Sequence, residues 1–349
     1  MSASAGEGDA AATGGDSGSN GDDAGGSDAQ GGAVASAGGA GKPATGCANC
    51  AAGTYCQDGV NKCRACSDFS RVEFGAAQPL STLSHAKGSV ERFPRSAGVG
   101  SALFYTEDAA VRREIWYAVA PTSGMGTAIQ GAAGPLLGND SGPLLAPGLG
   151  LGDTNFFFDR ANATTGERKI WTGNWAAGAL SSVDVASSPT NMDGSSDYSF
   201  AAAPSAGHAY WMSTRSGKAT LTWESIAENA MQEPEPLPLK IRIGANAQCD
   251  LLGDDATPWV NLNGTLLLFS AESMADTCEP NDSHAHDLFA VPLAKSGLPA
   301  SAAIPLSALN NTGGGSDETD PSLSPDACSV YFASDNGSGD YDLYKATRN

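Results

Sequence analysis

From about residue 74 to the C-terminus, short hydrophobic runs alternate with polar turns rich in glycine, serine and aspartate. The clearest unit spans 320–349. It predicts a strand, a tight turn at 324–327, a second strand around Phe332, a polar loop and a third strand, in that order. Hydrophobic runs this short, bounded by turn residues, indicate β-strands rather than helices.

The same order of hydrophobic runs occurs four more times upstream. The second run of each repeat carries an aromatic residue, and successive ones lie 53, 53, 58 and 63 residues apart: Tyr105, Phe158, Trp211, Phe269 and Phe332. A further short strand precedes each repeat, seen best at 79–83 and 305–309. A four-stranded unit that occurs five times predicts an all-β, five-bladed propeller. Six blades, or a β-sandwich with accidental spacing, are the alternatives.

A family resemblance rests on the last repeat, which reads DETDPSLSPDACSVYFASDNGSGDYDLYKATR. This segment resembles the TolB-like propeller repeat, in which Pro-x-x-Ser-Pro-Asp-Gly precedes a hydrophobic strand, Ser-Asp and Asp-Ile-Tyr. The other four repeats are degenerate at the turn, and the resemblance covers about residues 74–348. It implies the fold but no particular function, because such repeats serve as scaffolds, as binding domains and as accessory domains of enzymes.

The resemblance also implies how the ring closes. In this repeat type the segment before each inner strand is the outer strand of the preceding blade, so residues 74–83 are expected to complete the last blade. Pairing the first strand with the last in this way removes exposed sheet edges.

Five of the eight cysteines crowd residues 47–68 and predict a small disulfide-linked segment: Cys47, Cys50, Cys56, Cys63 and Cys66. The same segment contains two C-x-x-C pairs, which could bind zinc instead. Five cysteines cannot all pair among themselves, and the expected closure brings them beside Cys328. One of them is therefore predicted to bond Cys328, closing a loop worth roughly 4 kcal/mol. Cys249 and Cys278 are predicted to bond each other.

Residues 1–46 consist almost wholly of glycine, alanine, serine, aspartate, asparagine and threonine, and contain no aromatic residue. They are predicted to form a disordered tether, followed by the cysteine-rich segment at 47–68 and the propeller at 69–349. The tether resembles the spacer of a bacterial lipoprotein. This favours an extracytoplasmic location in the periplasm, at the outer membrane or on the cell surface, with a lipid anchor on a removed N-terminus as a hypothesis. No apolar run reaches the roughly 18 residues of a transmembrane helix.

The formal net charge of −20 argues against nucleic acid and against anionic membrane surfaces as partners. We expect a monomer that binds an envelope protein or a glycan through an acidic, looped face.

An acidic residue lies three positions before the proline or phenylalanine of the first strand in every repeat: Glu91, Asp140, Asp197, Asp255 and Glu318. These five residues, here called the ring acids, are predicted to surround one mouth of the central channel. They could attract calcium or a basic segment of a partner. Alternatively, each carboxylate accepts N–H bonds in its own entry turn.

Two further metal sites are weaker predictions. Asp335, Asp340 and Asp342 lie in a glycine-containing loop that resembles a calcium loop but lacks EF-hand spacing. His284 and His286 would point to the same face of a strand, as a metal-binding pair could.

No catalytic residue is predicted, because the chain contains no G-x-S-x-G nucleophile elbow and only four histidines. The alternative function is a five-bladed glycosidase or lyase that uses carboxylates in the channel.

Overall fold

The computed structural model describes residues 50–349 apart from 58–61, 71, 84–88, 97–101, 110–111, 120–125, 129, 132–133, 136–139, 148–153, 177–178, 188–189, 227–232, 244–246, 251–255, 273–284 and 311–315. All of these described residues belong to one compact unit, Ala44–Asn349.

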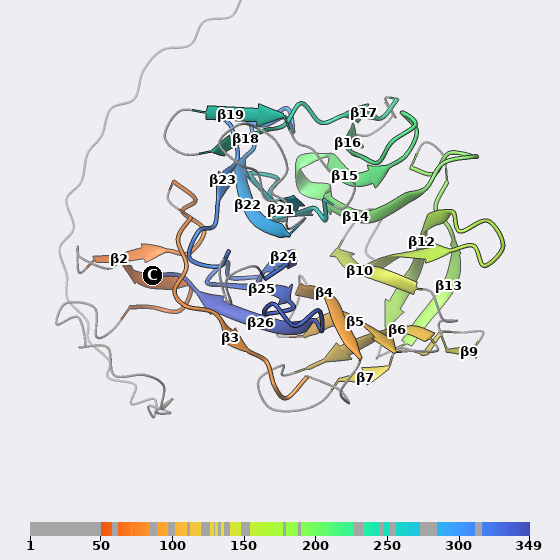
Figure 1. Cartoon of the computed structure of the whole chain (residues 1–349), viewed down its shortest axis with the longest axis horizontal. Helices are drawn as coiled ribbons and strands as arrows, with labels where there is room; N and C mark the ends of the chain where they lie inside the picture. Colours follow the sequence, from red (N-terminus) through yellow and green to blue (C-terminus); the bar gives the residue numbers. More distant parts are fainter. Residues whose placement is uncertain are drawn as a thin grey trace, which may run out of the picture. The chain divides into compact units, whose positions relative to one another are not determined.

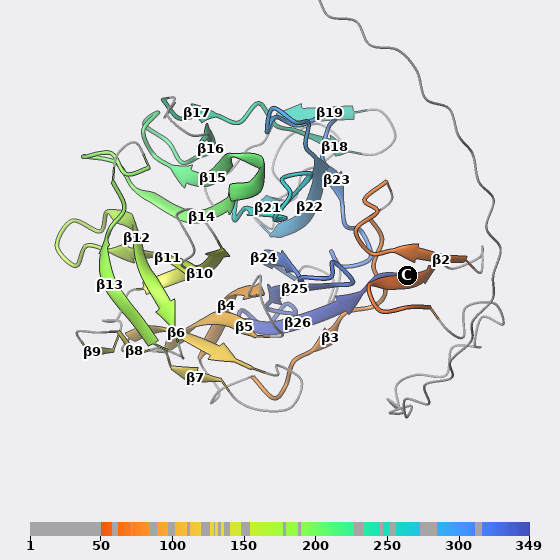
Figure 2. The same cartoon turned by 180° about the vertical axis from the view of Figure 1, so that it is seen from behind.

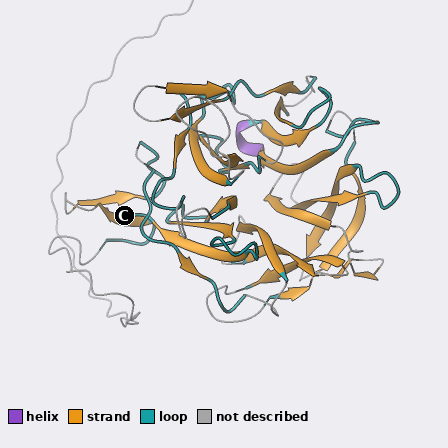
Figure 3. Ribbon diagram, in the orientation of Figure 1, coloured by secondary structure: helices purple, strands orange, loops and turns teal. Residues whose placement is uncertain are grey.

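Five of the seven β-sheets in the described residues are blades, and each is built around an antiparallel set of strands that corresponds to one sequence repeat (Figures 1 and 3). Blade 1 contains β4 (Val90–Ser96), β5 (Leu103–Ala109), β6 (Arg112–Ala118) and β7 (Thr127–Ala128). Blade 2 contains β10 (Asp140–Pro147), β11 (Thr154–Ala161), β12 (Arg168–Ala176) and β13 (Ala179–Val185). Blade 3 contains β14 (Asp197–Ala203), β15 (His208–Ser213), β16 (Thr220–Ser225) and β17 (Glu235–Pro236).

Blade 4 contains β20 (Trp259–Val260), β21 (Leu266–Glu272), β22 (His286–Pro292) and β23 (Ile304–Pro305). Blade 5 contains β24 (Glu318–Leu323), β25 (Ser329–Ser334), β26 (Asp342–Thr347) and β3 (Gln78–Pro79). The first strands of the blades contact one another in the circular order β4, β10, β14, β20, β24 and back to β4. The all-β, five-bladed propeller is therefore confirmed, and the six-bladed alternative is wrong.

The chain closes its own ring, as predicted. β3, from near the N-terminus, pairs antiparallel with β26 at the C-terminus, with Pro79 opposite Tyr344 and Gln78 opposite Lys345 (Figure 2). The backbone N–H of Leu80 donates to Leu343 O at 2.7 Å. Residues 81–83 then form a turn, so the closing strand is shorter than the 79–83 segment expected from the sequence.

The repeated aromatic residues form the centre of the blades. Each occupies the second strand of its blade and has no exposed surface: Tyr105, Phe158, Trp211, Phe269 and Phe332. Burying a side chain of this size contributes roughly 2–3 kcal/mol, which explains why the position stays aromatic although the turns differ between repeats.

Two features were absent from the sequence prediction. Blade 2 gains β8 (Gln130–Gly131) and β9 (Gly134–Pro135), because β8 pairs in parallel with β13. A separate hairpin, β18 (Lys240–Ile243) with β19 (Ala247–Asp250), precedes blade 4. Pairs this short carry too few residues to show a strand periodicity.

The cysteine-rich segment packs against the propeller. Its hairpin of β1 (Thr54–Gln57) and β2 (Lys62–Ala65) is linked through Cys50–Cys63, and Cys66 bonds Cys328 in the turn between β24 and β25. The predicted bond to Cys328 is therefore confirmed, and these cysteines form disulfides rather than zinc ligands.

Two other cysteines, Cys56 and Cys249, are also disulfide-bonded. Cys47 and Cys278 lie outside the described residues, so the predicted Cys249–Cys278 bond remains a prediction. Disulfides of this kind indicate an oxidising, extracytoplasmic compartment.

Arg348 also contacts the cysteine-rich segment and the residues that follow it. Its guanidinium lies 5.0 Å from the ring centroid of Tyr55, 5.7 Å from that of Phe69 and 5.6 Å from that of Phe74. Its Nη2 donates to Asp68 O at 2.8 Å. The segment thus joins the hydrophobic core between blades 4 and 5. Within the described residues, no helix is long and apolar enough to cross a membrane.

Candidate functional site

The ring acids lie where the inner strands begin, at one mouth of the channel. Asp140, Asp197 and Glu318 are the first residues of β10, β14 and β24, and Glu91 is the second residue of β4. All four are buried, with at most 1% of their surface exposed. Asp255 lies outside the described residues. The repeat alignment therefore located these residues correctly on the inner strands, but their burial was not evident from the sequence.

Arginine neutralises the ring acid of blade 2. Arg160 lies opposite Asp140 on β11 and binds it through two hydrogen bonds, Nε to Oδ1 at 2.6 Å and Nη2 to Oδ2 at 2.9 Å. Burial raises the pKa of Asp140, while the Arg160 bonds oppose that shift.

The ring acid of blade 3 accepts from four donors. Asp197 Oδ2 accepts the backbone N–H of Met192 at 3.0 Å and the hydroxyl of Ser195 at 3.1 Å. Its Oδ1 accepts the indole N–H of Trp211 at 3.2 Å and lies 3.1 Å from Arg215 Nη2. A carboxylate with this many donors is a structural anchor for the turn that enters β14.

A serine two positions before the ring acid donates its hydroxyl to that acid in three blades. The pairs are Ser89 with Glu91, Ser195 with Asp197, and Ser316 with Glu318. This Ser-x-acid pattern is visible in the sequence and was the missed signal for a local capping role.

Four inner strands, β4, β10, β14 and β24, also bulge just after their ring acids. Phe93, Ser199 and Asp320 each lie two residues after a ring acid and have φ values of 53°, 55° and 59°. Their backbone N–H groups donate to the preceding blade: Phe93 to Asp320 Oδ2, Ser199 to Asp159 Oδ2, and Asp320 to Thr257 Oγ1, at 3.0–3.3 Å. These three hydrogen bonds join blade 5 to blade 1, blade 2 to blade 3, and blade 4 to blade 5.

Arg95 of β4 makes further hydrogen bonds between the blades. Only 1% of it is exposed, and its guanidinium donates to the carbonyl oxygens of Asp320 and Pro321 in blade 5 and of Pro258 before blade 4, at 3.0–3.2 Å. Burial lowers its pKa to about 10, so it stays charged at neutral pH. One side chain therefore ties three blades together.

Asp320 supplies the charge that balances this arginine. It is fully buried, and Arg92 Nε lies 2.9 Å from its Oδ2. Burial alone would raise the pKa of Asp320, but Arg92 and Arg95 together hold it below its ordinary value. The centre of the propeller is thus a set of paired charges, and among the described residues no cluster of three metal-binding side chains occurs.

The loop that contains the predicted calcium site is stabilised by the carboxylate of Asp335. Asp335 Oδ1 accepts the backbone N–H of Asp317 at 2.8 Å and of Gly337 at 2.9 Å, and its Oδ2 accepts that of Gly339 at 3.1 Å. Asp340 lies in the turn of this loop, and Asp342 is the first residue of β26. The structure thus gives Asp335 a turn-forming role and does not gather the three carboxylates.

His286 begins β22 and contacts an aspartate. Its backbone N–H and its ring Nδ1 both lie within 2.9 Å of Asp317 Oδ1, and the hydroxyl of Tyr341 donates to Asp317 Oδ2. Although burial opposes the shift, the hydrogen bonds from His286 and Tyr341 lower the pKa of Asp317. His284 lies outside the described residues, so the predicted histidine pair is not observed as a pair.

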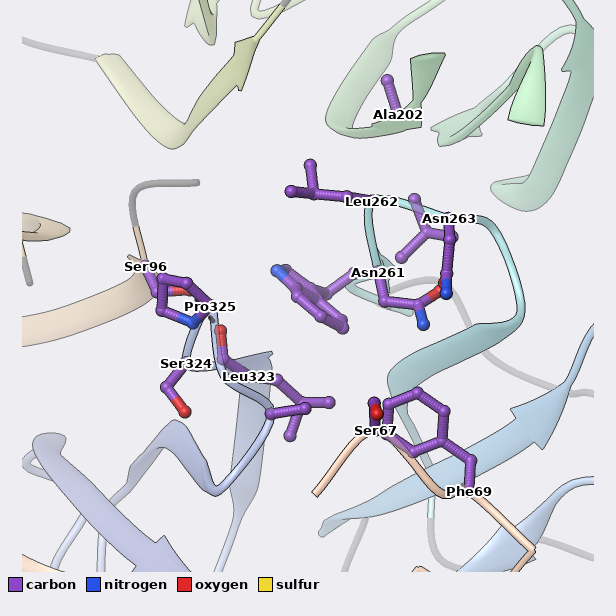
Figure 4. A pocket seen from close by; sticks show the side chains of 13 residues that line it. Ser67, Phe69, Ser96, Ala202, Asn261, Leu262, Asn263, Leu323, Ser324 and Pro325 are labelled. Atoms are coloured by element: carbon purple, nitrogen blue, oxygen red, sulfur yellow. Dashed lines mark hydrogen bonds between the residues drawn. The ribbon is translucent and has the colours of Figure 1, made fainter. Parts of the chain in front are cut away.

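A cavity of about 200 Å³ lies at the opposite mouth of the channel, where the inner strands end. None of its lining residues carries a formal charge, and we call it the neutral cavity: Ser67, Phe69, Ser96, Ala202, Trp259, Val260, Asn261, Leu262, Asn263, Leu323, Ser324, Pro325 and Ala327. Figure 4 shows Leu262, Pro325, Leu323 and Phe69 entering one space from different elements. No sequence pattern predicts this cavity, because its walls come from four blades and the cysteine-rich segment.

One buried carboxylate lies away from both mouths. Glu224 of β16 is 2% exposed, and neither of its carboxylate oxygens has a hydrogen-bond partner among the described residues. Burial raises its pKa to about 7, against the opposing charge of Arg215.

Glu224→Gln is expected to stabilise the protein at pH 8 but hardly at pH 5. Because the pKa is higher in the folded state than in the unfolded chain, Glu224 is tolerated while protonated and becomes unfavourable as the pH rises through about 7. We expect Glu224→Gln to raise the free energy of unfolding at pH 8 by roughly 1–2 kcal/mol, as measured by denaturant unfolding. Glu235→Gln, on the exposed strand β17, is the control and should show no such pH dependence. A gain from Glu224→Gln of equal size at both pH values would contradict this interpretation.

Comparison with solved structures finds similar chains at low sequence identity. The chain is similar to TolB from Acinetobacter baumannii, with 12% identity and a TM-score of 0.41 over 74% of this chain. This chain spans 54% of the length of that TolB chain. It is also similar to a putative TolB from Agrobacterium tumefaciens, with 10% identity and a TM-score of 0.39, over 77% of this chain and 82% of that chain.

The chain is also similar to two enzymes at low sequence identity. The GH43_1 enzyme from Xanthomonas citri in complex with xylose has 12% identity and a TM-score of 0.47, over 78% of this chain and 90% of the enzyme. The endo-arabinase from Bacteroides thetaiotaomicron has 9% identity and a TM-score of 0.47, over 80% of this chain and 98% of the enzyme. No family model and no curated protein matches the sequence. Identities this low do not transfer an activity to the chain.

Proposed function

We propose that this protein is a non-catalytic, extracytoplasmic propeller that binds a protein partner. The observation that carries the proposal is that the four described ring acids are buried and accept hydrogen bonds from their own chain. These bonds lie within each acid's own blade, so the carboxylates stabilise the turns that enter the inner strands and are not reserved for a ligand.

A glycosidase would need two carboxyl groups that reach the scissile bond, one of them able to exchange a proton with the substrate. Asp140 and Asp197 are each paired with an arginine, and the buried Arg95 joins blade 1 to residues of blades 4 and 5 through their carbonyl oxygens. This geometry favours the binding function over the carbohydrate-active alternative.

We place the protein in the bacterial envelope, with residues 1–46 as a spacer between an anchor and the propeller. The support is the composition of the tether together with the disulfides Cys50–Cys63 and Cys66–Cys328. A net charge of −20 favours a partner with a basic surface and a monomeric chain in solution.

Two assays on the oxidised full chain test the proposal. The first measures turnover of chromogenic glycosides and of xylan and arabinan oligosaccharides, and we expect none above that of the heat-denatured protein. The second immobilises the chain through its N-terminal tether and measures retention of envelope proteins, which we expect to be released by salt. Turnover that titrates with the folded protein would overturn the proposal.

A further inference from the structure

The neutral cavity is built for an apolar group. Trp259, Phe69, Leu262 and Leu323 are among the residues of its walls, and Leu262 is 43% exposed. A cavity of about 200 Å³ accommodates one aromatic ring or one branched aliphatic side chain, since roughly 150 Å³ suffices for benzene.

Most polar groups in the wall of the cavity already form hydrogen bonds with other groups of the protein. The Asn261 side chain donates to Thr265 Oγ1 and accepts the backbone N–H groups of Thr265 and Leu266, at 2.8–2.9 Å. The Ser96 hydroxyl donates to Leu323 O, and the Ser324 hydroxyl bonds within its own turn. A sugar, whose hydroxyls need several partners, would therefore find few here.

One acidic side chain next to the cavity in sequence is exposed without an ion pair among the described residues. Asp326 lies between Pro325 and Ala327, and its Oδ1 accepts the Ser324 hydroxyl and the Cys328 backbone N–H. Asp68, between Ser67 and Phe69, is instead paired with Arg64 at 3.3 Å. With the net charge of −20, Asp326 favours cationic neighbours around whatever enters the cavity.

We infer that the neutral cavity binds one large apolar side chain of a basic polypeptide segment. The inference rests on the proposed function and assigns the partner-binding site to this cavity. The apolar side chain would contact Trp259, Phe69 and Leu262, while lysine or arginine residues beside it would lie near Asp326. The disulfide Cys66–Cys328 would then hold one wall of the site, Ser67 and Phe69, against the propeller.

The test follows the indole N–H resonances of the oxidised, 15N-labelled full chain during peptide titration. The sequence has six tryptophans, and the Trp259 signal is assigned by its loss in Trp259→Phe. The probes are capped pentapeptides of sequence Gly-Lys-X-Lys-Gly with X as leucine, phenylalanine or glycine, together with Gly-Asp-Leu-Asp-Gly and free xylose.

We expect the leucine and phenylalanine peptides to shift the Trp259 signal and to bind at least about tenfold more tightly than the glycine peptide. The acidic peptide should bind more weakly than its lysine counterpart, with a difference that shrinks in salt. Leu262→Ser should weaken binding several-fold. The matched control is Met192→Ser, since Met192 is 54% exposed beside Asp197 at the other mouth, and it should leave binding unchanged.

Equal binding of the leucine and glycine peptides, or no shift of the Trp259 signal by any peptide, would overturn the inference. A shift by xylose alone would also overturn it and would identify a glycan site instead. These outcomes are separate from the proposed function, because glycoside turnover would remove the non-catalytic proposal even if the peptides bound the cavity as expected.

Discussion

Replacing Cys66 and Cys328 together with serine is expected to lower the free energy of unfolding by about 4–5 kcal/mol and the melting temperature by about 10 °C. The bond joins residues separated by 262 positions, so it restricts nearly the whole propeller in the unfolded state. The loss should be measured by denaturant unfolding of the oxidised protein, and reduction of the wild type should move its stability toward that of the variant.

The matched control is the double variant Cys50→Ser with Cys63→Ser. That disulfide closes a loop with a sequence separation of only 13, inside the cysteine-rich segment, so the entropic effect is smaller and local. If both double variants lost the same stability, the Cys66–Cys328 bond would not be the closure that we describe.

The repeat pattern predicted the parts of the structure that depend on hydrophobic burial. The aromatic residue of each second strand recurs because a large side chain fills the same space in every blade, as Phe158 and Phe332 do. The closing strand could also be predicted, because a four-stranded blade that lacks its outer strand leaves an edge that Gln78–Pro79 can cover.

Features that depend on pairing across the ring were not predictable from the repeats. Arg95 donates to residues more than 160 positions away, and nothing in the sequence around β4 marks it as the residue that enters the channel. The neutral cavity was missed for the same reason, since Phe69 and Leu262 approach each other only after the ring has closed. The four described ring acids lie on the inner strands, but the repeats did not predict that Arg160 and Arg215 pair with Asp140 and Asp197.

Asp197→Asn is expected to destabilise the protein by roughly 3 kcal/mol at pH 7. The substitution keeps the shape of the side chain but removes its charge and places an amide donor against the Ser195, Trp211, Met192 or Arg215 donors. Asp193→Asn, an exposed aspartate four residues earlier with the same charge change, should change the stability by less than about 0.5 kcal/mol.

The free energy of unfolding of Asp197→Asn relative to wild type, from urea titration at pH 7, therefore tests most directly whether the carboxylates at the channel mouth hold the propeller together. Our account predicts a clear loss of stability. An unchanged or increased stability, as is common when a residue reserved for ligand or substrate is neutralised, would contradict it.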